Sequence, residues 1–336
     1  MIARPTACAF ALLALASSAA AAGYHAPRTS FGDPDLQGLW TNSSLTTLER
    51  PQGLNDLVIA PEMAAKIEAM SKARLAENDK PTDPKNGAPP AADDPGGYNS
   101  FWLDAGSKFG VVNGQIRSSW ITDPADGHVP YSAKGRQDMM ESAMGQVGNF
   151  DGPEVRSLGE RCIVGYGSSG GPPMLNVLYN NNYQFVQTPG FVTIVVEMNH
   201  DARIVRLNAR HLPPTMRPWM GDSIGHWEGD TLVVETTNFN PNQRFTADIR
   251  FRLYLSPDSK VTERFTRVAK DEILYQFRVE EPSAYTQPWS GEMPLRATKG
   301  PMYEYACHEG NYALADILAG ARAKEGKHVR ASASDQ

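Results

Sequence analysis

The chain has 336 residues, of which 41% are hydrophobic and 21% charged, with a net charge of -6 and a pI near 5.7. This acidic balance argues against nucleic acid or an anionic membrane surface as a partner, because both attract concentrated Lys and Arg. No stretch approaches the roughly 20 apolar residues of a membrane helix, so no membrane insertion is expected.

The N-terminus has the pattern of a secretory signal. Arg4 precedes an apolar run from Cys8 to about Leu15, and small residues then continue to Ala22. These features predict a signal peptide over residues 1–22 and a periplasmic or secreted protein.

Residues 23–100 are predicted to form an N-terminal extension with one helix. Residues 36–42 begin an extended segment after a turn at Asp33-Pro34. A helix is predicted over 61–78, because Pro suits the first helical position and apolar residues follow at helical spacing. Residues 80–97, rich in Pro, Gly and Asp, predict a loop.

Residues 101–320 are predicted to be mainly β. A strand at 115–122, a helix at about 132–144 and a flexible glycine-rich loop at 165–173 come first. Strands are then predicted over 179–187, 191–198, 203–207, 224–228, 231–237, 249–255, 261–268, 272–280 and 287–295. Their short connections predict an antiparallel meander, whose edges are best removed by closing into a barrel. A helix is predicted from 312 to about 327, and residues 321–336 are assigned to a polar tail.

Several sequence blocks resemble known proteins. Gly38-Leu39-Trp40 is similar to the Gly-x-Trp start of lipocalin-like barrels. RSSWITDPADGHVPY, GERCI, LYNNNYQFVQTPGFVTIVVEMNHDARIV, HLPP, WMGDSIGHWEGDTLVVETTNFN and MYEYACHEGNYAL resemble the blocks of an abundant group of exported bacterial proteins, most of them uncharacterised. The resemblance implies a lipocalin-like (calycin-like) β-barrel with N-terminal helical decoration and a C-terminal helix, and it brings no established mechanism.

Two cysteines remain once the signal peptide, with Cys8, is removed. In an oxidising compartment, Cys162 and Cys307 are expected to form one disulfide. The alternative is a reactive thiol at one of them.

The segment 220–240, MGDSIGHWEGDTLVVETTNFN, resembles a hydrolase triad written in a row, but it also predicts a hairpin with a Gly-Asp turn. Outward pairing from that turn places Ser223 and His226 on opposite faces, so they cannot form a nucleophile and base. His226 and Glu235 fall diagonally on one face, either as an acid/base unit or as a solvent-side pair.

Two further clusters carry chemistry. In EMNHDARIV, polar residues follow the apolar run 191–196, which predicts a strand buried on both faces and a polar group at a barrel mouth. This group either binds or acts as a base, or it forms a turn with ion pairs. In CHEGN, His308 lies beside Cys307, so a disulfide would fix it near GERCI and the side chains of Glu160 and Arg161. The alternative is that the disulfide only staples this segment and His308 caps it.

We therefore expect an exported protein that binds a small apolar or aromatic molecule and acts on it by metal-independent acid/base chemistry, as a lyase, isomerase or hydrolase. Imidazole suits proton transfer near neutral pH. The catalytic candidates are His200, His226 and His308, with Glu197, Asp201, Glu235 and Glu309 to orient them. The substrate-binding candidates are Arg203, for an anion, and Trp219, Trp227 and Tyr183.

No cofactor motif is present. A zinc site would require three-dimensional convergence among His200, His211, His226 and His308, because no metal-ligand spacing occurs. The alternative function is a non-catalytic ligand-binding or structural module of the cell envelope. Two histidines and a carboxylate in one pocket would favour the enzyme, and an apolar cavity would favour the carrier.

Overall fold

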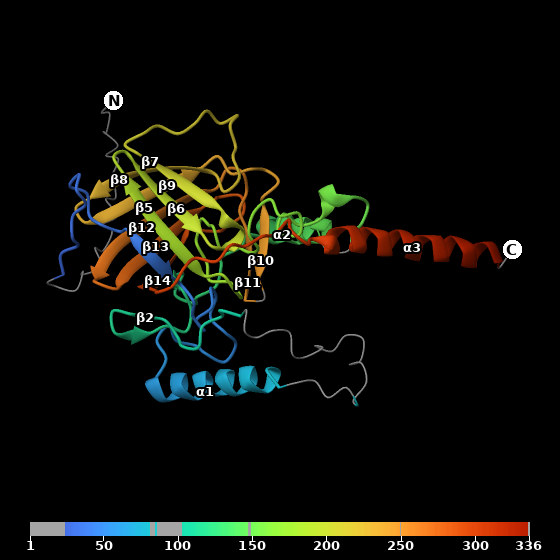
Figure 1. Ribbon diagram of the computed structural model, residues 1–336, viewed down its shortest axis with the longest axis horizontal. Coiled ribbons are helices and arrows are strands. Elements are labelled where there is room, and N and C mark those ends of the chain that lie inside the picture. The colour runs from blue at the N-terminus through green and yellow to red at the C-terminus, as the bar shows by residue number, and fades with distance from the viewer. Residues whose placement is uncertain (1–23, 81–84, 86–102, 147–148, 249, 335–336) are drawn as a thin grey trace, which may run out of the picture.

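The computed structural model describes residues 24–80, 85, 103–146, 149–248 and 250–334 (Figure 1). The predicted signal peptide and most of the predicted loop at 80–97 lie outside these residues. None of the helices that the structure describes is both long and apolar enough to cross a membrane.

A closed β-barrel forms the body, as the sequence predicts. A sheet of ten strands has the order β1-β5-β6-β7-β8-β9-β12-β13-β14-β4, and pairing of Trp40 on β1 with Ala297 on β14 closes nine of them. The nine are β1 Gly38–Thr41, β5 Asn182–Thr188, β6 Phe191–Val196, β7 Ala202–Leu207, β8 Asp222–Glu228, β9 Thr231–Thr237, β12 Lys260–Ala269, β13 Glu272–Glu280 and β14 Trp289–Ala297. β1 therefore belongs to the barrel, although it lies within the predicted extension 23–100.

One pairing departs from the predicted antiparallel meander. β7 and β8 are parallel, with Arg206 opposite Ile224, because residues 208–221 cross from the end of β7 back to the start of a strand that runs the same way. The barrel is therefore mixed, and His211 of this crossover segment contacts β8 and β9 through Asp222 and Glu235.

Smaller elements surround the barrel. β4 Ile121–Asp123 pairs with β14, while two hairpins, β2 Val111–Val112 with β3 Gln115–Ile116 and β10 Phe245–Asp248 with β11 Phe251–Tyr254, form separate sheets. The helices are α1 Pro61–Asn78, α2 Ala133–Gln146 and α3 Tyr312–Ser334, with short 3-10 turns η3 Pro153–Val155 and η4 Met198–His200.

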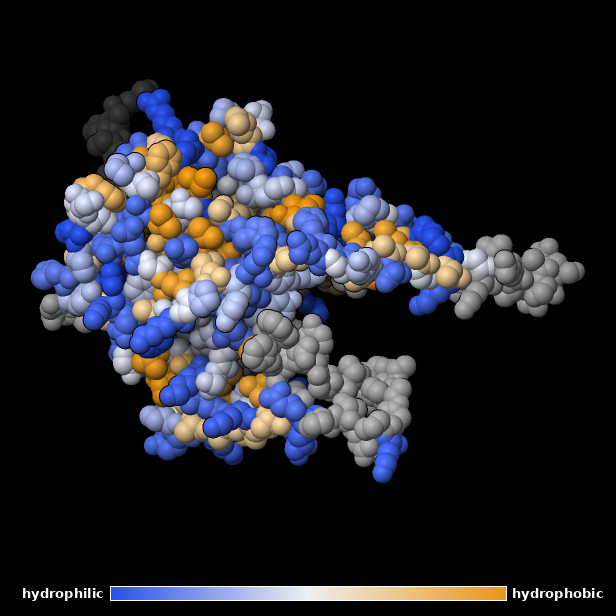
Figure 2. All heavy atoms as spheres, viewed as in Figure 1, coloured by the Kyte–Doolittle hydropathy of each residue, from blue (hydrophilic) through white to orange (hydrophobic). Residues whose placement is uncertain are grey.

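The predicted boundaries hold at α1, β9 and β13, and those of β6, β7, β8, β12 and β14 differ by one or two residues. Two other predictions fail for identifiable reasons. The single strand predicted at 115–122 is wrong, because the backbone between β3 and β4 bonds to residues 47, 48, 57 and 110 instead of continuing one ladder. α3 reaches Ser334, so much of the predicted polar tail is helical and projects from the body (Figure 1). Figure 2 shows hydrophobic surface where α3 joins the body.

Side chains fill the barrel interior. Phe265 stacks on Tyr275 with ring centroids 4.9 Å apart, and Phe277 meets Trp289 edge-on at 5.8 Å. The glycine-rich segment 165–173 is not the flexible surface loop predicted, because residues 170–177 are all buried and the Met174 N–H donates to the Tyr275 hydroxyl, 2.9 Å away. This segment therefore plugs the barrel.

β6 is buried on one face only. Val192, Ile194 and Val196 are fully buried, whereas Phe191 is 46% exposed. The prediction of burial on both faces is wrong, because the described residues leave the outer side of β6 partly open to solvent, with Phe191 exposed and Thr193 and Val195 only partly buried.

Candidate functional site

A pocket of about 630 Å³ lies against the disulfide between Cys162 and Cys307. We call it the disulfide pocket. Four segments line it: 162–164, 199–202, 218–220 and 304 with 306–309. Five residues chosen from the sequence converge here, namely His200, Asp201, Trp219, His308 and Glu309.

The first wall is the turn η4, which follows β6, and a buried carboxylate holds it. Glu197 is 2% exposed, and its two carboxylate oxygens accept hydrogen bonds from the Asn182 side chain at 2.6 Å and the Tyr303 N–H at 2.9 Å. Glu197 thus ties η4 to β5 and to the segment that leads to Cys307. It positions two walls of the pocket and does not line it.

The surroundings of Asp201 shift its pKa. Burial raises its pKa, although hydrogen bonds from the Gly165 N–H and the Asn199 side chain, together with the charge of His200, act in the opposite direction. The Gly165 N–H comes within 2.7 Å of Oδ2, and a Cβ on Gly165 would lie 2.5 Å from Met198 Cγ. Glycine is therefore required for this approach, and a carboxyl with a raised pKa can exchange a proton closer to neutral pH.

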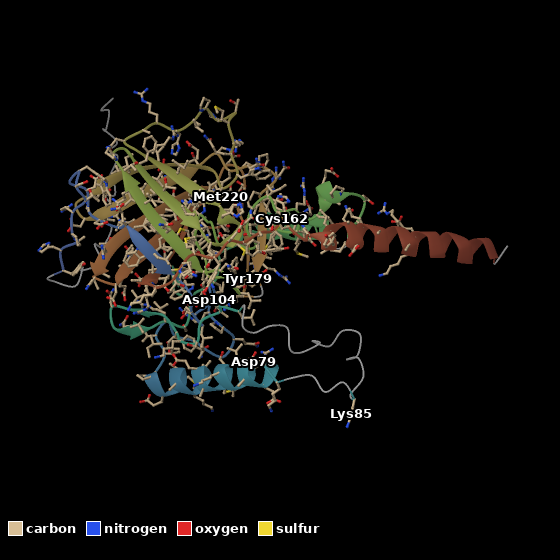
Figure 3. All side chains as sticks on the ribbon, in the orientation of Figure 1. Asp79, Lys85, Asp104, Cys162, Tyr179 and Met220 are labelled. Atoms are coloured by element: carbon tan, nitrogen blue, oxygen red, sulfur yellow. A yellow bond between two sulfur atoms is a disulfide. The ribbon has the colours of Figure 1, made fainter. Side chains whose placement is uncertain are left out.

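Backbone strain concentrates in the same pocket. Outside glycine and asparagine, positive φ angles occur in the described residues at Cys162 (φ 56), His200 (φ 44) and Met220 (φ 65). All three line the disulfide pocket, and Figure 3 shows Cys162 and Met220 near one another at one end of the barrel. Side chains in this left-handed region cost energy and cluster at functional sites, so this strain marks the pocket independently of its charges.

The wall with Trp219 and Met220 belongs to the β7–β8 crossover, and a histidine outside the pocket fastens that crossover. His211 Nδ1 lies 2.9 Å from Asp222 Oδ2 and its Nε2 lies 3.2 Å from Glu235 Oε1. Arg206 also bonds Asp222, at 2.8 Å. We call this the His211 staple. It was missed from the sequence, because only the parallel β7–β8 pairing folds HLPP back over the hairpin.

The C-terminal wall is fixed by the disulfide, which confirms the predicted pairing of Cys162 with Cys307. His308 and Glu309 follow it and are exposed. Besides the disulfide, Asn311 contacts GERCI, since its side chain donates to the Glu160 carbonyl at 3.0 Å. His308 therefore faces the pocket next to this segment and makes no hydrogen bond to Glu160 or Arg161.

The predicted pair of His226 and Glu235 does not form. The hairpin register is confirmed, with Ser223 opposite Thr236 and Ile224 opposite Glu235, and Ser223 is buried while His226 is exposed. His226 Nε2 lies 3.2 Å from Glu228 on its own strand, whereas Glu235 meets His211 and Lys260. The diagonal prediction failed because each side chain has a nearer partner.

The remaining candidates lie elsewhere in the barrel. Arg203 is 3% exposed and forms a two-point ion pair with buried Glu263, which also accepts from the Tyr275 hydroxyl at 2.7 Å. Tyr183 is fully buried and donates to the Ser169 carbonyl at 2.9 Å. Trp227 is half-buried and packs against the main core. The structure brings none of these three to the disulfide pocket.

The charges of the pocket limit what it can hold. Its lining, as the described residues form it, has the carboxylates of Asp201, Glu304 and Glu309 and the imidazoles of His200 and His308, with no Lys or Arg. Such a surface repels anions and suits a neutral or positively charged molecule. Trp219 adds a half-buried aromatic surface, which attracts cations and apolar rings.

Within the described ranges, no three His, Cys, Asp or Glu side chains are grouped so as to share a metal ion. Comparison of the chain with protein-family models, with curated proteins and with solved structures found no match.

Proposed function

We propose that this chain is an exported protein that binds a small neutral or positively charged organic molecule in the disulfide pocket and transforms it by acid/base chemistry. The observation that carries the proposal is the convergence of two histidines and three carboxylates in one pocket of about 630 Å³. Convergence of this kind is what distinguishes a proton-transfer site from an apolar carrier cavity.

Each residue has a role that its surroundings support. Asp201, with its pKa raised by burial, is the group whose proton affinity is tuned, and His200 next to it supplies an imidazole. His308 lines another wall of the same pocket and follows directly after the disulfide. An acid and a base on two walls of a pocket can remove a proton and return one elsewhere, as lyases, isomerases and hydrolases require.

Export and family membership belong to the same proposal. The N-terminal pattern of Arg4 and the following apolar run supports export, and the Cys162–Cys307 disulfide is the kind of bond that persists in an oxidising compartment. The closed barrel and the Gly38-Leu39-Trp40 start of its first strand support a lipocalin-like exported family.

The alternative is a binding module without turnover, and one observation favours it. Among the residues described, neither His200 nor His308 has a ring hydrogen bond to a carboxylate, and an oriented imidazole is the usual acid/base unit. In that case the same pocket holds the ligand unchanged.

The test is a panel of small neutral and cationic organic molecules, followed by proton NMR for chemical change and by calorimetry for binding. For a compound that is converted, we expect His200→Ala, His308→Ala and Asp201→Asn to reduce kcat/KM by roughly 10²- to 10⁴-fold. His226→Ala is the matched control, because His226 is exposed and lies outside the pocket.

The outcomes separate the two functions. Binding without conversion, lost in the pocket variants, would establish the carrier. Equal conversion by all four variants and the wild type would exclude these residues from catalysis. If ionised Asp201 is the base, activity falls as pH drops through its raised pKa, and Asp201→Asn abolishes that dependence.

A further inference from the structure

A second binding region lies between α2 and the β10–β11 hairpin, which pack against one another (Figure 1). Two hollows of about 650 and 740 Å³ meet there and share Asp248 and Arg252. Helix α2 lines both with one face, since Arg136, Met139, Ala143 and Met144 recur at helical spacing. We call this region the α2 groove.

One half of the groove is apolar and aromatic. Met144 is 72% exposed and Tyr166 is 37% exposed, and Phe245 and Tyr179 line the same hollow. Tyr179 is held by Tyr305, with ring centroids 6.4 Å apart and nearly parallel planes. Large apolar side chains left open beside a cavity favour an apolar or aromatic ligand.

The other half offers guanidinium groups beside three carboxylates. In the part of the chain that the structure describes, neither Arg136 nor Arg252 forms an ion pair with a carboxylate, and both are exposed. Three carboxylates lie in the same hollow and keep their negative charge, but each accepts a backbone N–H: Glu49 from Val129 at 2.7 Å, Asp126 from His128 at 3.0 Å and Asp248 from Arg250 at 3.1 Å. The exposed cationic donors of the hollow that have no carboxylate partner among the described residues are therefore the guanidinium groups of Arg136 and Arg252.

Arg250 differs from these two arginines. It is partly buried and donates to the carbonyls of Ser44 and Ala105, both at 2.8 Å, so it anchors the hairpin to the N-terminal segment. Arg252, shared by both hollows, is placed at the junction of the apolar and the charged halves. A guanidinium at such a junction suits a carboxylate attached directly to an apolar body.

We infer that the α2 groove binds a small aromatic carboxylate, with the anion on Arg252 and Arg136 and the ring among Tyr166, Tyr179 and Phe245. This site is separate from the disulfide pocket, whose lining has carboxylates and no Lys or Arg. The two regions therefore differ in the groups that they offer to an anion: the α2 groove has guanidinium groups, and the disulfide pocket has none.

The experiment uses three probes of one shape and different charge: 2-naphthoate, 2-naphthalenemethanol and 2-naphthylmethylammonium. Calorimetry on the full chain should show binding in the order anion, neutral, cation. Arg252→Gln should weaken 2-naphthoate about tenfold, as expected for loss of one charge-assisted bond, and leave 2-naphthalenemethanol unchanged. Phe245→Ala should weaken both, because it removes apolar contact and no charge.

Controls identify the site of binding. Arg278→Gln changes an arginine on the outer face of β13 that is 41% exposed, and it should leave all three affinities unchanged. A 2-naphthoate affinity that survives the double change Arg136→Gln with Arg252→Gln would overturn the inference. So would tighter binding of the ammonium probe, absence of any binding at millimolar concentration, or loss of 2-naphthoate binding in His308→Ala alone.

Discussion

Polar side chains are paired and buried in the barrel interior, whereas several of those at the end of the barrel near η4 are exposed. Inside, Arg203, Glu263 and Tyr275 satisfy one another and are buried. At the end, His200 and Arg252 are exposed beside open hollows, and strained backbone gathers in one of them. The paired groups of the interior belong to the folded core, and the end of the barrel holds the disulfide pocket and the α2 groove, where we propose that ligands bind.

Removing the disulfide is expected to have the largest effect and tests whether the end of the barrel depends on this bond. Cys162 and Cys307 are 145 positions apart, so their bond restricts a long loop in the unfolded chain and contributes as much as about 5 kcal/mol. We expect Cys162→Ser with Cys307→Ser to lower the free energy of unfolding in urea by up to that amount. Because Cys307 lies in the segment that forms one wall of the disulfide pocket, the affinity of that pocket for its ligand should fall too.

The α2 groove provides the control for that experiment, since neither cysteine lines it. Binding of 2-naphthoate should be retained in the folded double variant. If the disulfide pocket and the α2 groove lose ligand affinity equally, binding in the α2 groove also depends on the disulfide, and the two sites are not independent.

Substitution of Arg203 tests whether the buried ion pair with Glu263 stabilises the barrel interior. Leaving Glu263 buried without its cation costs about 3–5 kcal/mol, so Arg203→Met should lower the urea midpoint markedly. The double change Arg203→Met with Glu263→Leu should recover much of the loss, because an apolar pair of similar volume needs no partner. A substrate-binding role would appear instead as a changed ligand affinity with little change in stability.

The sequence of β12 contains a signal for the pair of Arg203 and Glu263. On β12, Glu263 falls between Val261 and Phe265, two positions away on either side, and both of those are fully buried. Because alternate strand residues share a face, a carboxylate at that position predicts a cation inside the barrel. The strand assignment was correct, and the same alternation places Arg203 with buried Val205.

Other parts of the site could not be predicted by local pattern. The ends of α1, β9 and β13 follow from spacing within one segment, and the hairpin register at Ser223 follows from its turn. The disulfide pocket requires four distant segments to meet, which depends on the parallel β7–β8 pairing and on the plug at residues 170–177. His200 and Asp201 could be chosen from the sequence by their residue types. Only the fold shows that His308 lines the same pocket.

The His211 staple is expected to give a pH-dependent effect of intermediate size. Burial alone would raise the pKa of Asp222, but hydrogen bonds from the Leu212 N–H, His211 and Arg206 outweigh it and hold the pKa below its usual value. A carboxyl whose pKa is lower in the folded state stabilises the fold above its unfolded pKa of about 3.9, and this contribution is lost as pH falls through the folded value.

Asp222→Asn should therefore reduce the free energy of unfolding by about 1–3 kcal/mol at pH 7, with a smaller difference below about pH 4. Urea unfolding of wild type and variant across this range measures it. A difference that stays constant with pH would mean that shape, and not charge, fastens the crossover to β8.

His226→Ala is expected to have the smallest effect on stability and ligand binding. It tests the outer face of the barrel, a third region beside the interior and the barrel end. His226 is 52% exposed in its side chain and lies 3.2 Å from Glu228, which also pairs with Arg264 at 2.9 Å. Exposed pairs of this kind contribute little, so unfolding should change by less than about 0.5 kcal/mol and ligand binding not at all. A tenfold loss of turnover in this variant would contradict the contrast directly, because His226 does not line the disulfide pocket.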